Sequence, residues 1–396
     1  MNNKLQYTAL FFCFCLFGSC NEDRLEPADT KTFIKMYGDS KYPLTAVDAR
    51  LHPDGGFVLL ANAEYKVGEG ANEAFALMPK IIKTDKNGNI VAQNTLGTGR
   101  NEVSYALEIA GPDSYLIVGK HIHENKEDFM VIETNNNGEI VNRFTKQFTL
   151  PARARAVTVL KNGNYFVIGE VGSGNVSSFA VELSPDFTEV SSRLFEDTKT
   201  SITNKVFENN KGLVYWAGNI DYGQKKGNLT GYTPGGLIEV DDEFPKDNAS
   251  SFEVTSFYSS AGSSNFGFLG TDLGGSDKDV KFVYASEHGK TITETTFKGI
   301  SGDDIPSSIT QASDGGFLAL STSDHIGQGR DFMLLKINGS TGENMFAEPL
   351  FFGGENDEEA AAVLTTPDGG ILMFGTTVFA NVNTLLTIKI NVNGEF

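Results

Sequence analysis

A short pattern that returns about every 50 residues constrains the fold of this chain more than any other feature. Its clearest copies are PDGGFVLLAN (53–62), SDGGFLALST (313–322) and PDGGILMFGT (367–376). Weaker copies are PDSYLIVGK (112–120), KNGNYFVIGE (161–170), NKGLVYWAGN (210–219) and SSNFGFLGT (263–271). Each copy is a turn followed by a short apolar, β-prone run that ends near a small residue, which predicts a strand. The predicted strands begin at Phe57, Tyr115, Tyr165, Leu213, Phe266, Phe317 and Ile371.

A second pattern lies between these copies: IIKTDKNGNIV (81–91), VIETNNNGEIV (131–141) and TIKINVNGEF (387–396). Asn-Gly between apolar runs is typical of a hairpin turn in which both turn residues adopt positive φ. Residues 85–89 also resemble the start of a calcium loop, but the glutamate that would complete such a loop is missing. Because the segment recurs at one phase of the repeat, we interpret it as a turn.

Each repeat therefore holds four short strands, one before the Gly turn, one after it and two around the Asn-Gly hairpin. Four-stranded units of this length predict an all-β fold, a β-propeller of antiparallel blades. Residues 31–396 give seven repeats, but the last one stops at Phe396 without an outer strand. The segment TFIKMYGDSKYP (32–43) resembles the outer strands of other copies, so we expect it to close the ring as the fourth strand of blade 7.

The Asp-Gly-Gly and Asn-Gly signatures resemble the delta-60-like propeller repeats of bacterial secreted and surface proteins. The resemblance covers residues 31–396 and is good in blades 1, 2, 6 and 7, but poor in blades 4 and 5. It implies a fold and no particular activity.

The N-terminus is predicted to be a membrane anchor. Lys4 precedes an apolar run up to Ser19, which is too short to span a membrane and has the length of a signal-peptide core. Phe17-Gly18-Ser19-Cys20 resembles the lipobox of bacterial lipoproteins, although Leu is usual where Phe17 stands. We expect residues 1–19 to be a signal peptide, Cys20 to be acylated and residues 20–30 to form a tether. The alternative is an ordinary secretory signal with a chance cysteine.

Residues 21–23 (Asn-Glu-Asp) look like the export signal of lipoproteins displayed on the outer face of the bacterial outer membrane. A solvated linker in a periplasmic lipoprotein is the alternative. The chain has 32 Lys and Arg against 51 Asp and Glu, a formal charge of −19 that becomes −20 once Lys4 is removed with the signal. Nucleic acid requires clustered positive charge, so it is excluded as a partner, and the membrane is expected to be reached through the acyl anchor alone.

No catalytic residue, metal site or cofactor is predicted. His121 and His123 are the closest pair of histidines, and we interpret them as exposed loop residues beside solvated acids. Carboxylates such as Asp303, Asp304 and Asp357–Glu359 could serve acid–base chemistry if they met at the axis. Because Glu102, Asp304 and Glu358 share one phase of the repeat, we expect them instead to cap backbone N–H groups where one blade passes to the next.

Loop asymmetry indicates where a partner binds. Turns after the first and third strands are predicted to be tight, whereas the connections between second and third strands read as long and chemically varied. Variable loops on a rigid scaffold often carry recognition. The aromatic and basic residues predicted to bind a partner there are Tyr65, Tyr222, Lys225, Lys226, Tyr232 and Arg330.

These features support three functional hypotheses. The first is a recognition or scaffolding subunit of an outer-membrane complex for uptake, secretion or assembly, with an integral outer-membrane protein or another surface lipoprotein as partner. The second is a glycan-binding lipoprotein, which exposed aromatic side chains would favour; Trp216 is expected to be core. The third is a hydrolase or lyase with axial carboxylates. A broad apolar surface would favour the first hypothesis.

Overall fold

The computed structural model describes residues 32–38, 42–67, 74–97, 101–195, 199–221, 223–244, 251–259, 264–299, 302–324 and 329–396. The signal peptide, the tether, Cys20 and Tyr222 lie outside these ranges, so their predicted roles remain predictions. The described chain from residue 32 onward belongs to one compact unit. No helix among the described residues has the length and apolarity needed to cross a membrane.

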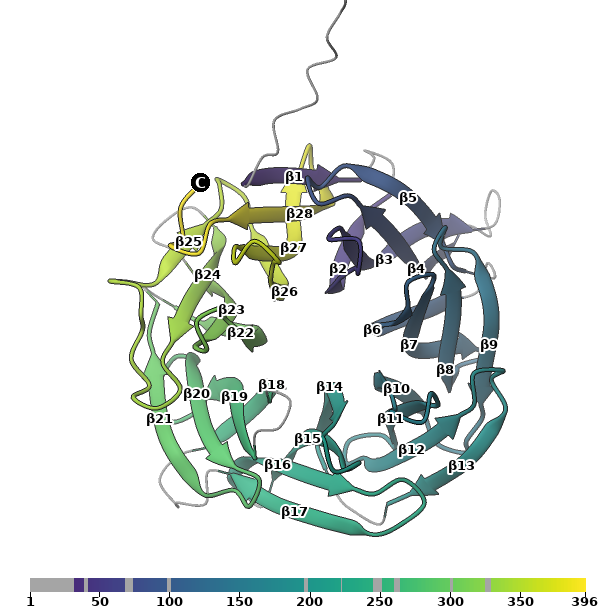
Figure 1. Cartoon of the computed structure of the whole chain (residues 1–396). Helices are drawn as coiled ribbons and strands as arrows, with labels where there is room; N and C mark the ends of the chain where they lie inside the picture. Colours follow the sequence, from purple (N-terminus) through teal and green to yellow (C-terminus); the bar gives the residue numbers. More distant parts are fainter. Residues whose placement is uncertain are drawn as a thin grey trace, which may run out of the picture. The chain divides into compact units, whose positions relative to one another are not determined.

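Seven four-stranded sheets are arranged as blades around a common axis (Figure 1). Blade 1 contains β2 (Leu44–Leu51), β3 (Phe57–Val67), β4 (Ala74–Thr84) and β5 (Ile90–Thr95). Blade 2 contains β6 (Asn101–Gly111), β7 (Ser114–His123), β8 (Lys126–Asn135) and β9 (Ile140–Lys146). Blade 3 contains β10 (Ala152–Val159), β11 (Tyr165–Val171), β12 (Ser177–Leu183) and β13 (Glu189–Leu194). Blade 4 contains β14 (Ser201–Glu208), β15 (Val214–Asp221), β16 (Lys225–Tyr232) and β17 (Ile238–Phe244).

The remaining blades follow the same order from the axis outward. Blade 5 contains β18 (Phe252–Tyr258), β19 (Asn265–Asp272), β20 (Asp279–Ser286) and β21 (Thr291–Phe297). Blade 6 contains β22 (Asp304–Gln311), β23 (Phe317–Asp324), β24 (Arg330–Ile337) and β25 (Leu350–Phe352). Blade 7 contains β26 (Glu358–Thr365), β27 (Ile371–Phe379), β28 (Val382–Ile390) and β1 (Phe33–Tyr37). The predicted all-β, seven-bladed propeller of antiparallel strands is confirmed.

The N-terminal strand closes the ring as predicted. β1 pairs antiparallel with β28, with Phe33 opposite Lys389 and Tyr37 opposite Leu385. Figure 1 shows β1 beside β28, on the outer edge of blade 7. Phe33 and Tyr37 alternate with the more exposed Ile34 and Met36, so one face of β1 packs into the core while the other faces outward.

Apolar side chains between blades form the core. Seven buried hydrophobic clusters are found among the described residues, one at each junction of neighbouring blades. Trp216, fully buried, packs at the junction of blades 3 and 4 against Phe166 and Phe195, which confirms its prediction as core. Each blade therefore buries both its faces against neighbours, and a closed ring leaves none of these faces to solvent.

The two repeat signatures meet in space, which the sequence did not indicate. The Asp of the Asp-Gly-Gly turn binds a buried lysine two residues before the next turn of its own blade. The three pairs are Asp54–Lys83 at 2.9 Å, Asp314–Lys336 at 2.7 Å and Asp368–Lys389 at 2.8 Å. Burial is the largest single influence on each Asp and opposes its charge, but the lysine hydrogen bond and the other hydrogen bonds to the carboxylate together outweigh it. They lower the pKa of all three, to about 2 for Asp54.

The Asn-Gly turns differ from their predicted type. Only the glycine has positive φ, as in Gly88 at 76°, and the residue that opens each turn uses its side chain as a cap. Asp85 Oδ1 accepts the N–H groups of Asn87 and Asn89 at 2.9 and 2.8 Å. The pairing of β4 with β5 shifts register after Lys83, so the turn that contains Gly88 ends in a β-bulge with one extra residue. The hairpin was predicted correctly, but the positive φ of its asparagine was wrong.

Candidate functional site

The predicted contrast between the two faces of the ring is only partly correct. We call the face that carries the connections between second and third strands the loop face, and the opposite one the turn face. Two connections on the loop face are two-residue turns, Glu124-Asn125 and Ala380-Asn381, whose residues all have positive φ. The prediction that connections between second and third strands are long is therefore wrong in blade 2, because β7 and β8 extend through residues 121–128. The turn face, conversely, carries the long connection 338–349.

The basic residues predicted to bind a partner form ion pairs with neighbouring acids. Lys225 Nζ lies 2.9 Å from Glu253 and Arg330 Nη2 lies 2.8 Å from Glu359. Lys226 Nζ is 3.9 Å from a carboxylate oxygen of Glu243. Lys225 and Lys226 begin β16 in blade 4, but as consecutive strand residues they point to opposite faces and reach acids in different blades. Arg330 begins β24 in blade 6, apart from both.

The described tyrosines of the predicted set also lie in strands. Tyr65, near the end of β3, donates or accepts a 2.7 Å hydrogen bond with Thr95 and packs against the Tyr42 ring. Tyr232 ends β16, is 5% exposed and packs against Phe166 and Phe195. Its prediction as a loop residue on the binding face is wrong, because the apolar alternation of β16 turns the ring into the junction with blade 3.

Two of the three recurring acids, Asp304 and Glu358, cap backbone groups where blades connect, as predicted. Asp304 accepts the Gly299 N–H at 2.5 Å, and Glu358 accepts the Gly354 N–H at 2.9 Å. Burial raises the pKa of both carboxyls, and Asp279 and Asp331 reinforce the shifts for Asp304 and Glu358 respectively.

Glu102, the third acid at this phase, is instead bound by Arg143 at 2.6 Å. The two neighbouring histidines also differ from their prediction, because they end strand β7 instead of lying in a loop. The rings of His121 and His123 are 5.3 Å apart, and His123 lies 3.2 Å from Asp128. Among the described residues no group of three or more His, Cys, Asp or Glu side chains is placed to hold a metal ion.

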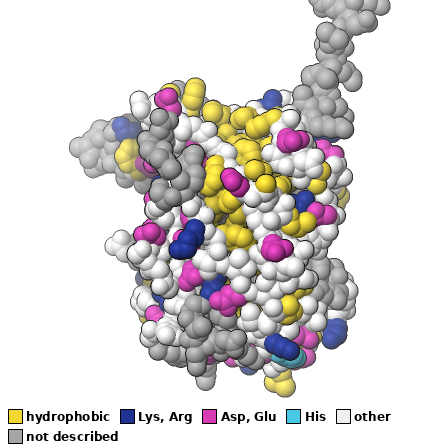
Figure 2. Space-filling model, turned by 90° about the vertical axis from the view of Figure 1, so that its left-hand side faces the viewer, with side chains coloured by type: hydrophobic (Ala, Val, Ile, Leu, Met, Phe, Trp, Pro, Cys, Tyr) yellow, Lys and Arg dark blue, Asp and Glu magenta, His cyan; other side chains and the backbone are white. Residues whose placement is uncertain are grey.

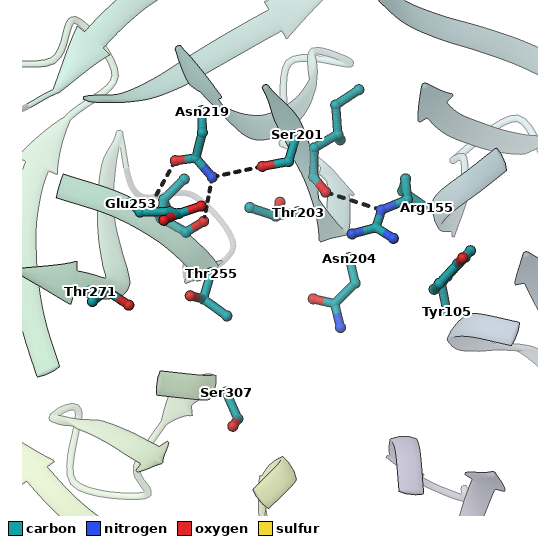
Figure 3. Close-up of a pocket in the computed structure, with 12 residues that line it drawn as sticks. Tyr105, Arg155, Ser201, Thr203, Asn204, Asn219, Glu253, Thr255, Thr271 and Ser307 are labelled. Atoms are coloured by element: carbon teal, nitrogen blue, oxygen red, sulfur yellow. Dashed lines mark hydrogen bonds between the residues drawn. The ribbon is translucent and has the colours of Figure 1, made fainter. Parts of the chain in front are cut away.

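The feature that sequence reasoning missed is a ring of side chains at the axis. Every inner strand shifts register at a similar level of the axis. Six of these shifts skip one residue, and the one in β14 skips three, Thr203 to Lys205. In blades 2 to 6 these bulges place a polar residue in the wall of a cavity of about 310 Å³. We call these five residues the mouth ring: Tyr105, Arg155, Asn204, Thr255 and Ser307 (Figure 3).

A signal for this ring was present in the sequence. The small residue that ends most of the repeated apolar runs is glycine, and it lies beside the bulge. A Cβ on Gly119 would meet the Val103 carbonyl oxygen at 1.9 Å, and one on Gly169 would meet the Arg153 carbonyl oxygen at 2.2 Å. The glycine therefore allows the two backbones to approach closely where the inner strand bulges.

A second cavity of about 230 Å³ lies further along the axis, lined by the later residues of the inner strands. Here Arg50 binds Asp48 at 2.5 Å and approaches Glu108 at 3.5 Å, while Lys205 Nζ is 3.9 Å from Asp48. Burial lowers the pKa of Lys205 to about 8, and burial raises the pKa of Glu108. Carboxylates do meet at the axis, but different ones from those considered from sequence, and Arg50 binds both.

An apolar groove of about 450 Å³ lies on the rim between blades 6 and 7. Its apolar side chains come from β1, β25, β27, β28 and the C-terminus: Ile34, Met36, Phe351, Phe352, Phe379, Leu386, Ile388 and Phe396. Ile34 is 55% exposed and Phe379 is 60% exposed. Figure 2 shows hydrophobic side chains gathered on the upper part of this side of the ring. The groove exists because β25 pairs with only three residues of β24, so the outer edge of blade 6 is short.

No protein-family model and no curated protein matches this sequence. Among solved structures, a catalytically inactive virginiamycin B lyase from Staphylococcus aureus with quinupristin has a TM-score of 0.53 at 11% identity, over 91% of this chain and 99% of that chain. A puromycin-hydrolyzing peptidase from Mycobacterium tuberculosis has a TM-score of 0.53 at 8% identity, over 88% and 51%. A NanB sialidase from Streptococcus pneumoniae has 0.48 at 9%, over 92% and 71%. At this level of identity the comparisons show the fold alone: the chain is a seven-bladed β-propeller.

Proposed function

We propose that the chain is a surface lipoprotein of the bacterial outer membrane, built from delta-60-like repeats and acylated at Cys20. In this proposal it is a recognition subunit of an outer-membrane protein complex. The observation that supports a protein partner most directly is the apolar rim groove. Contiguous exposed apolar surface is uncommon on a protein that functions alone and often marks a protein interface.

The groove also suggests the chemistry of the partner. Its polar wall includes Glu358, and Glu395 precedes the terminal Phe396 of its apolar wall. With the chain as a whole strongly acidic, a partner is favoured that places apolar side chains in the groove and Lys or Arg around them. The basic residues predicted from the sequence to bind a partner support docking less well, because Lys225 and Arg330 already bind Glu253 and Glu359.

The docking proposal is tested by purifying the protein from detergent-solubilised outer membranes and identifying co-purifying proteins by mass spectrometry. The complex is then rebuilt from purified components. Charge in the groove, introduced as Ile34→Asp with Phe379→Asp, should abolish binding of the identified partner. Val91→Asp, a change at an equally exposed site on β5, is the matched control and should leave binding intact. Equal binding by the groove variant and the parent would refute docking at the groove.

The anchor is tested separately. Cys20→Ala should move the protein from the membrane fraction to the soluble fraction, because the mature chain has no other acylation site of this type. Protease added to intact cells should degrade the parent protein if it is displayed outward. A variant that still sediments with washed membranes would contradict the lipoprotein assignment without affecting the docking experiment.

The glycan-binding alternative is favoured by a different observation, the polar cavity at the mouth ring, and is developed below.

A further inference from the structure

The mouth ring has unused hydrogen-bonding capacity. The hydroxyl groups of Tyr105, Thr255 and Ser307 have no hydrogen-bond partner among the described residues. Asn204 Oδ1 is buried and has none either. In Figure 3 these side chains point toward the open centre of the ring from four different blades. Of these groups Asn204 Oδ1 is the buried one, and the three hydroxyls around it are partly exposed. Buried polar atoms normally have partners, so Asn204 Oδ1 beside these hydroxyls indicates a polar ligand or the water that it displaces.

Arg155 is held with one edge free. Its Nε donates to the Ile202 carbonyl oxygen at 3.2 Å and lies 3.8 Å from Glu170 Oε1, and its guanidinium lies 4.6 Å from the centre of the Tyr105 ring. These three contacts fix the plane of the group through its Nε edge, whereas Nη1 and Nη2 donate to none of the described residues. A guanidinium held in this way binds a carboxylate through two parallel hydrogen bonds.

The rest of the wall suits hydroxyl groups. Thr255, Ser307 and Thr271 can each donate and accept a hydrogen bond, as the hydroxyls of a sugar require. The acid in the wall, Glu253, is bound by Lys225 at 2.9 Å. A cavity of about 310 Å³ is at the small end of the range for small-molecule sites.

We infer that the mouth ring binds a single sugar unit that carries one carboxylate, a uronic acid, with the carboxylate on Arg155 and the hydroxyls on Asn204, Thr255 and Ser307. The overall charge of the chain argues against a polyanion, which the acidic surface would repel, but one carboxylate on a fixed guanidinium is tolerated. This site lies at the axis and does not depend on the rim groove or on the proposed protein partner.

The test is calorimetric titration of the purified protein with D-glucuronate, D-galacturonate and D-glucose in 0.15 M salt. The protein should bind at least one of the two uronates. It should bind D-glucose at least about tenfold more weakly than that uronate, because D-glucose cannot form the charge-assisted pair with Arg155. Absence of binding by both uronates, or D-glucose binding as tightly as they do, would overturn the inference.

Two variants locate the site. Arg155→Met should weaken uronate binding about tenfold or more, with Arg155→Lys between it and the parent because an ammonium cannot pair with both oxygens. Thr255→Val with Ser307→Ala should weaken the uronate and D-glucose alike. Arg193→Met, in the outer strand of the same blade, is the matched control and should bind as the parent does. Melting curves show which variants fold, and uronate binding unchanged in both ring variants would place the ligand elsewhere.

Discussion

Blades 6, 7 and 1 differ from blades 3, 4 and 5 in the contacts that their polar side chains make. The first three carry the most regular Asp-Gly-Gly copies, and each holds an Asp–Lys pair between its turn and its third strand. The other three lack that motif, yet they supply most of the wall of the axial cavity, from Arg155 to Thr271. The Asp–Lys pairs thus belong to the three most regular blades, whereas most of the cavity wall comes from the irregular ones.

The comparison teaches how a repeat protein can carry a site. Where the repeat is strict, the repeated residues form turns, ion pairs and junction cores, all of which serve folding. Where it weakens, the bulge still brings one residue per blade to the axis, but that residue is free to vary. Tyr105, Arg155, Asn204, Thr255 and Ser307 are all polar and lie in the register shifts of their strands, but they differ in size and charge.

The largest expected effect concerns the regular blades and tests how blade 7 closes the ring. A chain that starts at Pro43 lacks β1 and exposes the edge of β28 from Leu385 to Lys389. Removing the buried Phe33 and Tyr37 together should cost more than the about 3–5 kcal/mol typical of one buried aromatic. The truncated chain should aggregate or melt far below a chain that starts at Thr30. Equal melting temperatures, measured by circular dichroism, would show that closure does not require β1.

The next effect concerns blade 3, one of the irregular blades, and connects its stability with ligand binding. Gly169→Val would force a side chain against the Arg153 carbonyl oxygen and the Phe129 ring, and overpacking of this kind costs about 1–3 kcal/mol. Because the same bulge positions Arg155, uronate binding should fall together with the melting temperature. Gly111→Ala is the control, since its Cβ would have open space. A Gly169→Val variant as stable as the parent would contradict the claim that the bulge requires a glycine beside it.

A smaller effect distinguishes the regular blades by pH. The folded state lowers the pKa of Asp54, Asp314 and Asp368, so their stabilisation is present above the unfolded pKa near 4 and is lost as pH falls toward 2. Lys83→Met, Lys336→Met and Lys389→Met should each lower stability at pH 7 by up to about 1 kcal/mol, since the Asp partners are half exposed. Urea unfolding should show the deficit shrinking between pH 4 and pH 2. A deficit that does not change with pH would assign the loss to packing.

The smallest effect concerns the charged cluster deeper in the axial channel. Lys205 should titrate near pH 8, below the usual value for a lysine, when its methylated form is followed by NMR. Glu108→Gln should lower the pKa of Lys205 further, and Arg50→Gln should raise it, because these neighbours act on the ammonium with opposite sign. Shifts in the reverse directions would contradict the arrangement of the cluster.

Much of the fold could be predicted because its signals are local. A glycine turn, an alternating strand and an Asn-Gly hairpin each depend on a few neighbouring residues, and their period gave seven blades and the closing role of residues 32–38. The same locality explains the errors. The two-residue turn at Glu124-Asn125 has no glycine to mark it, and the polar stretch around it was interpreted as a loop although strands continue through it.

The candidate site could be predicted least, because it is made by distant residues. The sequence by itself determined the repeat, the blade number, the acidic surface and the core position of Trp216. Only the tertiary structure decided that Lys83 reaches Asp54, that a short β25 opens an apolar groove and that Arg155 and Asn204 face one cavity. The physical reason lies in the bulge of each inner strand: one extra residue reverses which side chains face the axis. Closure of the ring then brings side chains from five blades around a single cavity.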